Sequence, residues 1–272
     1  MSNKKIGIIG VGNMGLAIIS GAISSGVFTK DDIIAFEKNE VRQKHIESTI
    51  GICFASSLQD LARCELILMA VKPQDLEDVS KSLSEYILPE TLVVSVAGGV
   101  TTETLQKYLS GKGHIIRVMP NTPVSVCSGV SALCIGDRCT EEDIKKTQKL
   151  FQSLGTTLVI KEDMFDAISA LSGSGPAYFF YMIEALAASA IQRGFDEKTA
   201  LNLVIETCYG AIKLLKSSGK SPQELRKEVT SPGGSTAEAI EVFDKEKMPG
   251  TINNAIEAAI HRSKEMDRQN TN

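Results

Sequence analysis

Residues 6–15 read Ile6-Gly7-Ile8-Ile9-Gly10-Val11-Gly12-Asn13-Met14-Gly15, an apolar run followed at once by the spacing G-x-G-x-x-G. The apolar run predicts a buried strand, and the helical period of apolar residues over 13–25 predicts a helix after it. In such a turn the first glycine permits the bend, the second lets a pyrophosphate approach the backbone, and the third allows close packing. The helix N-terminus supplies N–H donors. The pattern therefore predicts a dinucleotide site.

Outward from this turn, the two halves of the chain differ in pattern. Short apolar runs predict strands over residues 5–9, 32–36, 52–54, 65–70, 92–96, 115–119, 128–135 and 156–160. Beyond residue 160 the pattern is helical, with helices expected over 164–171, 176–193, 196–217, 222–229, 235–243 and 249–269. We therefore predict an α/β fold, with a parallel Rossmann-type sheet in a dinucleotide-binding domain of residues 1–160 and an all-helical domain of residues 161–272.

The composition excludes several classes of protein. Of the 272 residues, 43% are hydrophobic and 23% are charged, which is ordinary for a globular chain. The net charge is −4 and no basic block occurs, so we do not expect nucleic acid as a partner. The 6 cysteines form no C-x-x-C pair and only 3 histidines are present, so we expect no metal site. Free thiols are typical of the reducing cytoplasm, where we expect the protein.

The longest apolar run, residues 177–191, is too short to cross a bilayer and carries Glu184 in mid-span, so we expect no membrane contact. No signal sequence is expected, because the first apolar run leads directly into the glycine turn. A helix that is apolar almost all round must be covered on every side. A helical domain of this size has too little bulk to cover it alone, so we expect a homo-oligomer.

Further residues are expected at the carboxyl edge of the sheet, where open α/β folds bind ligands. Glu37 and Lys38 follow the second expected strand, beside the adenosine ribose. A carboxylate there favours the 2′-OH of NAD and a cation favours the 2′-phosphate of NADP, so this pair leaves the cofactor choice open. Lys72 follows the fourth strand and precedes Pro73 at a helix start. Segments 96–99 and 119–123 also follow strands and face the same crevice.

Two glycine- and serine-rich segments lie in the helical half, SGSGP over 172–176 and TSPGGST over 230–236. Each precedes a helix and presents N–H groups and hydroxyls at its N-terminus, an arrangement that suits a small carboxylate. Together with a nucleotide site, the two segments indicate an enzyme with a small anionic substrate.

These segments together resemble the pyrroline-5-carboxylate reductase family. The resemblance spans the chain through motifs in the family's order: GVGNMG (10–15), AVKP (70–73), RVMPNTP (117–123), LSGSGPAY (171–178) and, most specific, EVTSPGGSTAEAIEVF (228–243). It implies an N-terminal Rossmann domain, a C-terminal helical domain that dimerises, and often a higher assembly of dimers. It also implies reduction of L-1-pyrroline-5-carboxylate to L-proline with NADP(H) or NAD(H), the last step of proline biosynthesis.

Position in the sheet and the resemblance together give the expected site residues. Those expected to bind the cofactor are Ile9, Gly10, Val11, Gly12, Asn13, Met14, Gly15, Glu37, Lys38, Ala70, Val71, Lys72, Pro73, Val96, Ala97, Gly98 and Asn121. Those expected to bind the substrate are Ser231, Gly233, Gly234, Ser235 and Thr236. The Thr236 hydroxyl is the expected catalytic group, which fixes the ring nitrogen. Glu37 departs from the family, since many members carry a small, polar or basic residue there.

Two other functions fit part of the pattern. A β-hydroxyacid dehydrogenase also begins with G-x-G-x-M-G, but it uses a lysine on an interdomain helix as acid and base and leaves 231–236 unexplained. A non-catalytic nucleotide-sensing regulator on the same scaffold would bind cofactor without turnover. We expect the reductase, because a protonated cyclic imine accepts hydride without a protein base and leaves orientation as the main task of the protein.

Overall fold

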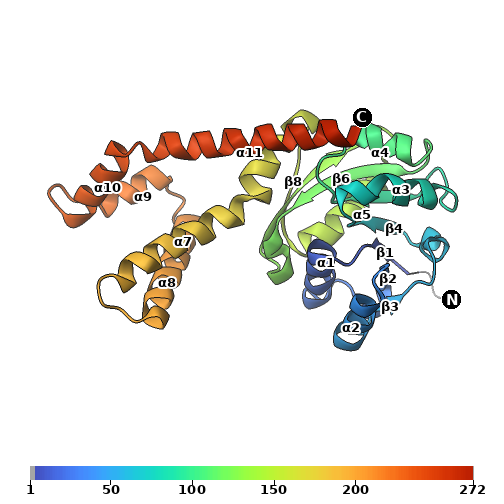
Figure 1. Cartoon of the computed structure of the whole chain (residues 1–272), viewed down its shortest axis with the longest axis horizontal. Helices are drawn as coiled ribbons and strands as arrows, with labels where there is room; N and C mark the ends of the chain where they lie inside the picture. Colours follow the sequence, from blue (N-terminus) through green and yellow to red (C-terminus); the bar gives the residue numbers. More distant parts are fainter. Residues whose placement is uncertain (1–3, 272) are drawn as a thin grey trace. The chain divides into compact units, whose positions relative to one another are not determined.

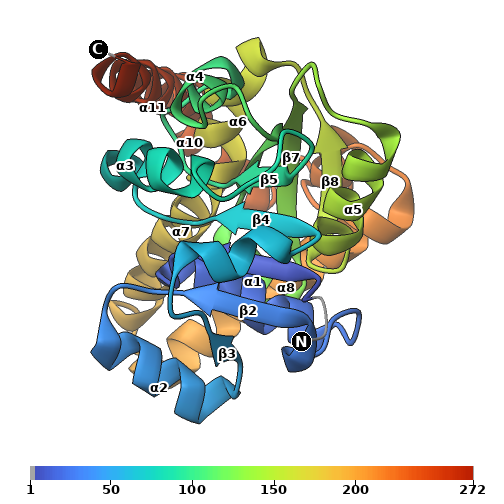
Figure 2. The ribbon, with the colours of Figure 1, turned by 90° about the vertical axis from the view of Figure 1, so that its right-hand side faces the viewer.

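The computed structural model describes residues 4–271, which form one sheet and a set of helices (Figure 1). The described strands are β1 (Ile6–Ile9), β2 (Ile33–Phe36), β3 (Cys53–Phe54), β4 (Leu66–Met69), β5 (Leu92–Ser95), β6 (His114–Pro120), β7 (Gly129–Ile135) and β8 (Gly155–Val159). Their order is β3-β2-β1-β4-β5-β6-β7-β8. Figure 2 labels β3, β2, β4, β5, β7 and β8 of this sheet. The first six strands have the order typical of dinucleotide-binding sheets, which confirms the predicted Rossmann-type domain.

The sheet is parallel except where β6 meets β7. These two strands pair antiparallel from Ile116 opposite Ile135 to Pro120 opposite Ser131. Only a short turn with the 3₁₀ helix Thr122–Val126 connects them, whereas a parallel pair needs a crossover of about a dozen or more residues. Strand β7 therefore runs back along β6. Helix α5 (Glu141–Gln152) then provides a crossover, and β8 lies parallel to β7.

Helices cover both faces of the sheet. One face is covered by α5 together with α1 (Asn13–Ser24) and α2 (Glu40–Ile50), and the other by α3 (Pro73–Ser84) and α4 (Thr102–Tyr108). Neighbouring residues of β1 contribute to opposite sides, with Ile8 in the first core cluster and Ile9 in the second. Because strand side chains alternate between faces, a continuous apolar run is what a sheet covered on both faces requires.

The buried side chain of Arg117 connects the sheet to the segment that follows β8. Arg117 in β6 is 2% exposed, and its guanidinium lies 3.5 Å from the ring centroid of Phe165 and 3.2 Å from Glu162 Oε1. Glu162 also accepts hydrogen bonds from the backbone N–H and the hydroxyl of Thr102, at 2.9 and 2.5 Å. Helix α6 (Phe165–Ile168) and a π-helical turn, Ser169–Gly173, follow directly. This cluster therefore fixes the start of the segment that carries the SGSGP motif.

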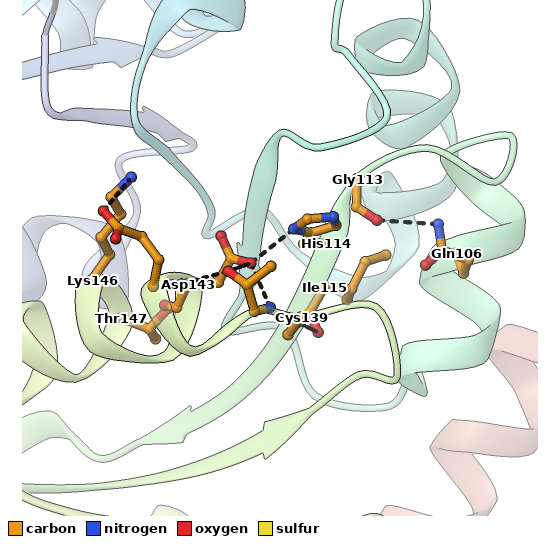
Figure 3. Close-up of polar contacts among 10 residues, drawn as sticks. Gln106, Gly113, His114, Ile115, Cys139, Asp143, Lys146 and Thr147 are labelled. Carbon is orange, nitrogen blue, oxygen red and sulfur yellow. Dashed lines mark hydrogen bonds and ion pairs between the residues drawn. The ribbon is translucent and has the colours of Figure 1, made fainter.

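A second polar cluster ties the amino end of β6 to α5 (Figure 3). Asp143 Oδ2 accepts hydrogen bonds from the backbone N–H and the hydroxyl of Thr140 at 2.8 and 2.7 Å, and lies 2.8 Å from His114 Nδ1. Beside it, the Cys139 thiol donates to the Ile115 carbonyl oxygen at 3.1 Å. Burial raises the pKa of Asp143, but the hydrogen bonds from Thr140 and His114 outweigh burial and hold the pKa below its ordinary value of 3.8.

The chain divides into two compact units, one with the residues up to Pro176 and those from Ala259 onward, and the other with Ala177–Ala258. The second unit takes most of α7 (Gly175–Ile191), then α8 (Glu197–Ser218), α9 (Pro222–Glu228), α10 (Ser235–Lys245) and the first part of α11 (Met248–Thr271). Within the described range, no strand follows β8, as predicted for the helical half.

Helices α7 and α8 expose many apolar side chains. Phe179, Phe180 and Tyr181 of α7 are 66, 66 and 73% exposed, and Tyr209 of α8 is 63% exposed. An apolar surface of this kind marks a site where another protein surface packs, which supports the expected homo-oligomer. Between residues 4 and 271, no helix is both long and apolar enough to span a membrane.

The Asp143 cluster predicts a pH-dependent contribution to stability. At pH 7 we expect Asp143→Asn to lower the free energy of unfolding by about 1–3 kcal/mol, since hydrogen bonds to a charged acceptor are lost. Because the pKa is lowered on folding, this contribution is complete above 3.8 and is lost as the pH falls through the folded-state pKa. Denaturant unfolding at pH 7 and pH 3 should therefore show a smaller difference between variant and wild type at pH 3. Glu141→Gln, which changes an exposed carboxylate in the same first turn of α5, is the control. An equal deficit at both pH values would assign the effect of Asp143→Asn to packing.

Candidate active site

A pocket lies where β1, β2 and β4 end. It is lined by Ile9, Gly10, Gly12, Phe36, Glu37, Lys38, Arg42, Ala70, Val71, Lys72, Gln74, Asp75 and Val79. Strand β1 pairs with β2 on one side and β4 on the other, so the strand order reverses there. Open α/β sheets bind ligands outside the carboxyl ends of the strands at such a point. The pocket brings together predicted cofactor residues from three separate segments.

The three glycines of the first turn differ in their surroundings. Gly10 has a φ of +88°, and a Cβ there would lie 2.9 Å from the Ala70 carbonyl oxygen. A Cβ on Gly15 would overlap the carbonyl oxygen of Gly10, so the turn and α1 pack backbone against backbone. A Cβ on Gly12, in contrast, would meet no described atom within 4 Å. Gly10 and Gly15 are thus required by the fold, whereas Gly12 borders open space of the kind that a pyrophosphate fills.

The N-terminus of α1 is open to an anion. Gly12 is its N-cap, and no side chain in residues 4–271 caps it. The first N–H groups of a helix have no partner within it and carry partial positive charge. Of the neighbouring predicted residues, Asn13 is exposed, Met14 packs partly against the core and Val11 is buried. The free N–H groups and the space at Gly12 together fit the pyrophosphate of a dinucleotide.

Glu37 turns toward this loop. Its Oε2 accepts a hydrogen bond from the Val11 N–H at 3.0 Å, and its Oε1 accepts one from the Asn39 N–H at 2.9 Å. Arg42 Nη1 lies 3.7 Å from Oε2, and the Glu37 side chain is only 11% exposed. The carboxylate is therefore a fixed part of the pocket wall, while Lys38 is exposed.

The turn after β4 presents Lys72. The Ala70 N–H donates to the Ile9 carbonyl oxygen at 2.8 Å, which extends the pairing of β1 and β4 by one residue. Lys72 is the N-cap of α3 and Pro73 is its first residue, as the sequence predicts. The exposed Lys72 side chain therefore stands at the pocket rim.

The predicted residues 96–98 and Asn121 do not line the pocket. Ala97 is buried, and its N–H donates to the Ser95 hydroxyl at 3.3 Å. Asn121 is 8% exposed; its Oδ1 accepts from the Val130 N–H at 2.8 Å, and its Nδ2 donates to the Ser172 hydroxyl at 3.4 Å. The Asn121 side chain therefore joins the 119–123 turn to β7 and to the SGSGP segment, so that two of the sequence motifs lie side by side.

The 231–236 segment forms a turn at the start of α10. The Gly234 N–H donates to the Ser231 carbonyl oxygen at 3.0 Å, and Gly233 has a φ of +69°, as a type II turn with proline before glycine favours. Helix α10 begins at Ser235 with Gly234 as N-cap, and within residues 4–271 no side chain caps it. Thr236 is exposed in the first helical turn and does not cap the helix. The first N–H groups of α10 have no partner within the helix, an arrangement that suits an anionic ligand.

Sequence reasoning missed five pocket residues: Phe36, Arg42, Gln74, Asp75 and Val79. Arg42 lies in the first turn of α2, where the N-cap Asn39 accepts its N–H at 2.9 Å. Asparagine at position 39 is a helix-start signal, and the helix that follows a pocket strand begins at the same edge of the sheet. The first turns of α2 and α3 were therefore foreseeable as pocket walls.

Comparison with known proteins identifies the family. Residues 162–266 match the family model for pyrroline-5-carboxylate reductase dimerisation, and residues 5–99 match the model for NADP oxidoreductase, coenzyme F420-dependent. The chain is 37% identical to a pyrroline-5-carboxylate reductase of Methanosarcina acetivorans, over 99% of this chain and 100% of that one. It is 40% identical to one of Pisum sativum, over 96 and 95%. The chain belongs to the pyrroline-5-carboxylate reductase family.

A solved structure agrees in fold along the whole chain. The crystal structure of Plasmodium falciparum pyrroline carboxylate reductase with NADP bound matches with a TM-score of 0.89 and 31% identity, covering 98% of this chain and 99% of that one. The match of residues 162–266 to a dimerisation model supports a homo-oligomer for this member of the pyrroline-5-carboxylate reductase family as well. The resemblance drawn from the motifs is thereby confirmed.

The surroundings of the glycines predict opposite outcomes for one kind of substitution. Gly12→Val is expected to weaken NADPH and NADH binding at least about tenfold, because its side chain fills the space beside the pyrophosphate. Stability should fall by at most about 2 kcal/mol, the cost of an unfavourable N-cap residue, since the space beside Gly12 is open. Gly15→Val is the matched control, and it should lower the melting temperature because it overlaps the Gly10 backbone. Cofactor titration and thermal melting of both variants test this, and normal binding by Gly12→Val would place the pyrophosphate elsewhere.

Proposed function

We propose that this chain reduces L-1-pyrroline-5-carboxylate to L-proline with hydride from NADPH or NADH. The observation that carries the proposal is a glycine turn open to a pyrophosphate in a chain that matches pyrroline-5-carboxylate reductases over nearly its full length. Residues 1–160 serve as the dinucleotide-binding domain, and residues 161–272 serve as the substrate and dimerisation domain.

The cofactor-binding residues follow from the pocket and its neighbours. Gly10 to Gly15 receive the pyrophosphate, and Glu37 and Lys38 flank the adenosine ribose. Ala70 to Pro73 line the cofactor on the β4 side, with Lys72 in a positioning role and no part in proton transfer. Val96 to Gly98 and Asn121 lie outside the pocket described. They border the cofactor in this proposal because they belong to the turns that follow β5 and β6.

The turn from Ser231 to Thr236 is the proposed substrate site. Its N–H groups at the start of α10 suit the substrate carboxylate. The exposed Thr236 hydroxyl, free of a capping role, fixes the ring nitrogen. When bound, the nicotinamide supplies the hydride. The protein orients the imine carbon and stabilises charge around it, which is where much of the rate enhancement in such a reaction arises. Within residues 4–271, no group of His, Cys, Asp or Glu side chains could hold a metal ion.

An NAD(P)H-oxidation assay with L-1-pyrroline-5-carboxylate tests the reaction directly. Turnover with proline as product is expected with both cofactors. Cofactor binding without turnover would favour a nucleotide-sensing regulator, and turnover with β-hydroxyacids in place of the imine would favour a β-hydroxyacid dehydrogenase.

Within this reaction, Thr236→Val is the sharpest test of the substrate turn. Because the change keeps shape and removes one hydrogen bond to a charged substrate, kcat/KM should fall by about 1.5–3 kcal/mol, or roughly 10- to 150-fold. Cofactor affinity should change much less, since Thr236 belongs to the other compact unit. Thr236→Ser should retain most activity, and Thr251→Val, the same change in the first turn of α11, is the control. A Thr236→Val enzyme with normal kinetics would move the substrate site elsewhere.

The assembly proposed is a cytoplasmic homodimer, with dimers joined into a higher assembly. Light scattering at micromolar concentration should give a mass at least twice the 29.3 kDa of one chain. Phe180→Glu should shift the protein toward monomer, because a charge is placed on the exposed apolar face of α7. Val41→Glu is the matched control, since Val41 is 80% exposed on α2 in the other unit. A wild-type monomer would refute the assembly.

A further inference from the structure

The carboxylate of Glu37 is held in place by backbone groups of the protein. Both of its oxygens accept backbone N–H groups, from Val11 at 3.0 Å and from Asn39 at 2.9 Å. One of these donors belongs to the glycine turn and the other to the turn that starts α2, so Glu37 links the two turns that flank the pocket. To move away, the side chain would leave two backbone donors without their partner in a site where it is only 11% exposed. The carboxylate is therefore held at the pocket wall by two backbone donors.

The Glu37 carboxylate lies at the position where the adenosine ribose of a dinucleotide binds in folds of this type. Glu37 is the first residue after β2 and lines the pocket with Gly12. An acidic residue at this place accepts the ribose 2′-OH of NAD. A carboxylate has about four acceptor positions, so the two backbone bonds leave positions for a hydroxyl donor. A 2′-phosphate, in contrast, offers negative charge to a group that can only accept.

The nearby cations reduce this repulsion and do not reverse it. Arg42 Nη1 lies 3.7 Å from Glu37 Oε2, so part of its charge already balances the carboxylate. The Arg42 side chain is 50% exposed, so solvent and salt screen its charge. Lys38 also lines the pocket and is exposed. A 2′-phosphate must therefore share cations that Glu37 already engages, whereas a 2′-OH needs none.

We infer that Glu37, fixed by the Val11 and Asn39 N–H groups, makes this enzyme prefer NADH over NADPH, and that Arg42 keeps NADPH usable. The inference rests on the proposed function for the identity of the reaction, and on the pocket geometry alone for the preference.

Equilibrium binding tests the preference without turnover. The dissociation constants of NADH and NADPH are measured by fluorescence titration. Those of ADP-ribose and 2′-phospho-ADP-ribose are measured by competition with bound NADH. We expect wild type to bind the member of each pair that lacks the 2′-phosphate about tenfold tighter or more. The ratio of the two dissociation constants should become smaller at high salt, because the charges are screened. Equal or tighter binding of the phosphorylated members would overturn the inference. Absence of turnover with pyrroline-5-carboxylate would instead count against the proposed function and leave this ratio standing.

Matched variants assign the preference to its residues. Glu37→Ser removes the charge and opens space, and Glu37→Gln removes the charge at constant size; both should shift the ratio of dissociation constants toward NADPH by about tenfold or more. Glu40→Gln removes the same charge from an exposed position in α2 that does not line the pocket, and its ratio should stay at the wild-type value. Arg42→Gln should weaken NADPH more than NADH. A ratio that Glu37→Ser and Glu37→Gln leave unchanged would overturn the role of Glu37.

Discussion

The close approach of three backbone segments at the ends of β1, β2 and β4 sets the position of every other part of the cofactor site. The Gly10 N–H donates to the Phe36 carbonyl oxygen at 2.8 Å, and the Ala70 N–H donates to the Ile9 carbonyl oxygen at the same distance. Gly10 must lack a side chain because it faces Ala70, and Gly15 must lack one because it faces Gly10. These backbone contacts fix the position of the start of α1. The open space beside Gly12, at this helix start, is fixed with it.

Side chains have different roles along β6. Near the middle of the strand, Arg117 packs on Phe165 and pairs with Glu162, so the sheet determines where the chain leaves it toward the helical half. Asn121, just beyond the strand, bonds the SGSGP segment through Ser172. The amino end is held by the Asp143 cluster, away from the carboxyl edge. A histidine beside an aspartate, a pairing that also occurs in active sites, thus contributes to stability there.

The sequence predicts those structural features that depend on neighbouring residues, and not those that depend on residues distant along the chain. Strand ends such as 92–96 were placed within a residue or two, because apolar runs and glycine turns are local signals. The reversal of β7 was not foreseen, since apolar patterns carry no strand direction, although the short link after residue 119 was a clue. The orientation of Glu37 could not be predicted, because it depends on an N–H of Val11 that lies 26 residues away along the chain. For the same reason the inward bonding of Asn121 could not be predicted. Thr236 lies in the first turn of α10, within the helix expected over 235–243.

Helix α11 connects the last residues of the chain to its first unit. Its final part, from Ala259 onward, belongs to the same compact unit as the nucleotide-binding sheet, and the Ser263 hydroxyl donates to Asp166 Oδ1 at 2.6 Å. That unit is therefore discontinuous, with all of Ala177–Ala258 made between its two pieces. During synthesis, the ribosome has released the glycine turn and all eight strands long before this closing contact can form. The N-terminal unit is complete only when both ends of the chain are present, so loss of the C-terminal helix would remove contacts from the half of the protein that is farthest from it in sequence.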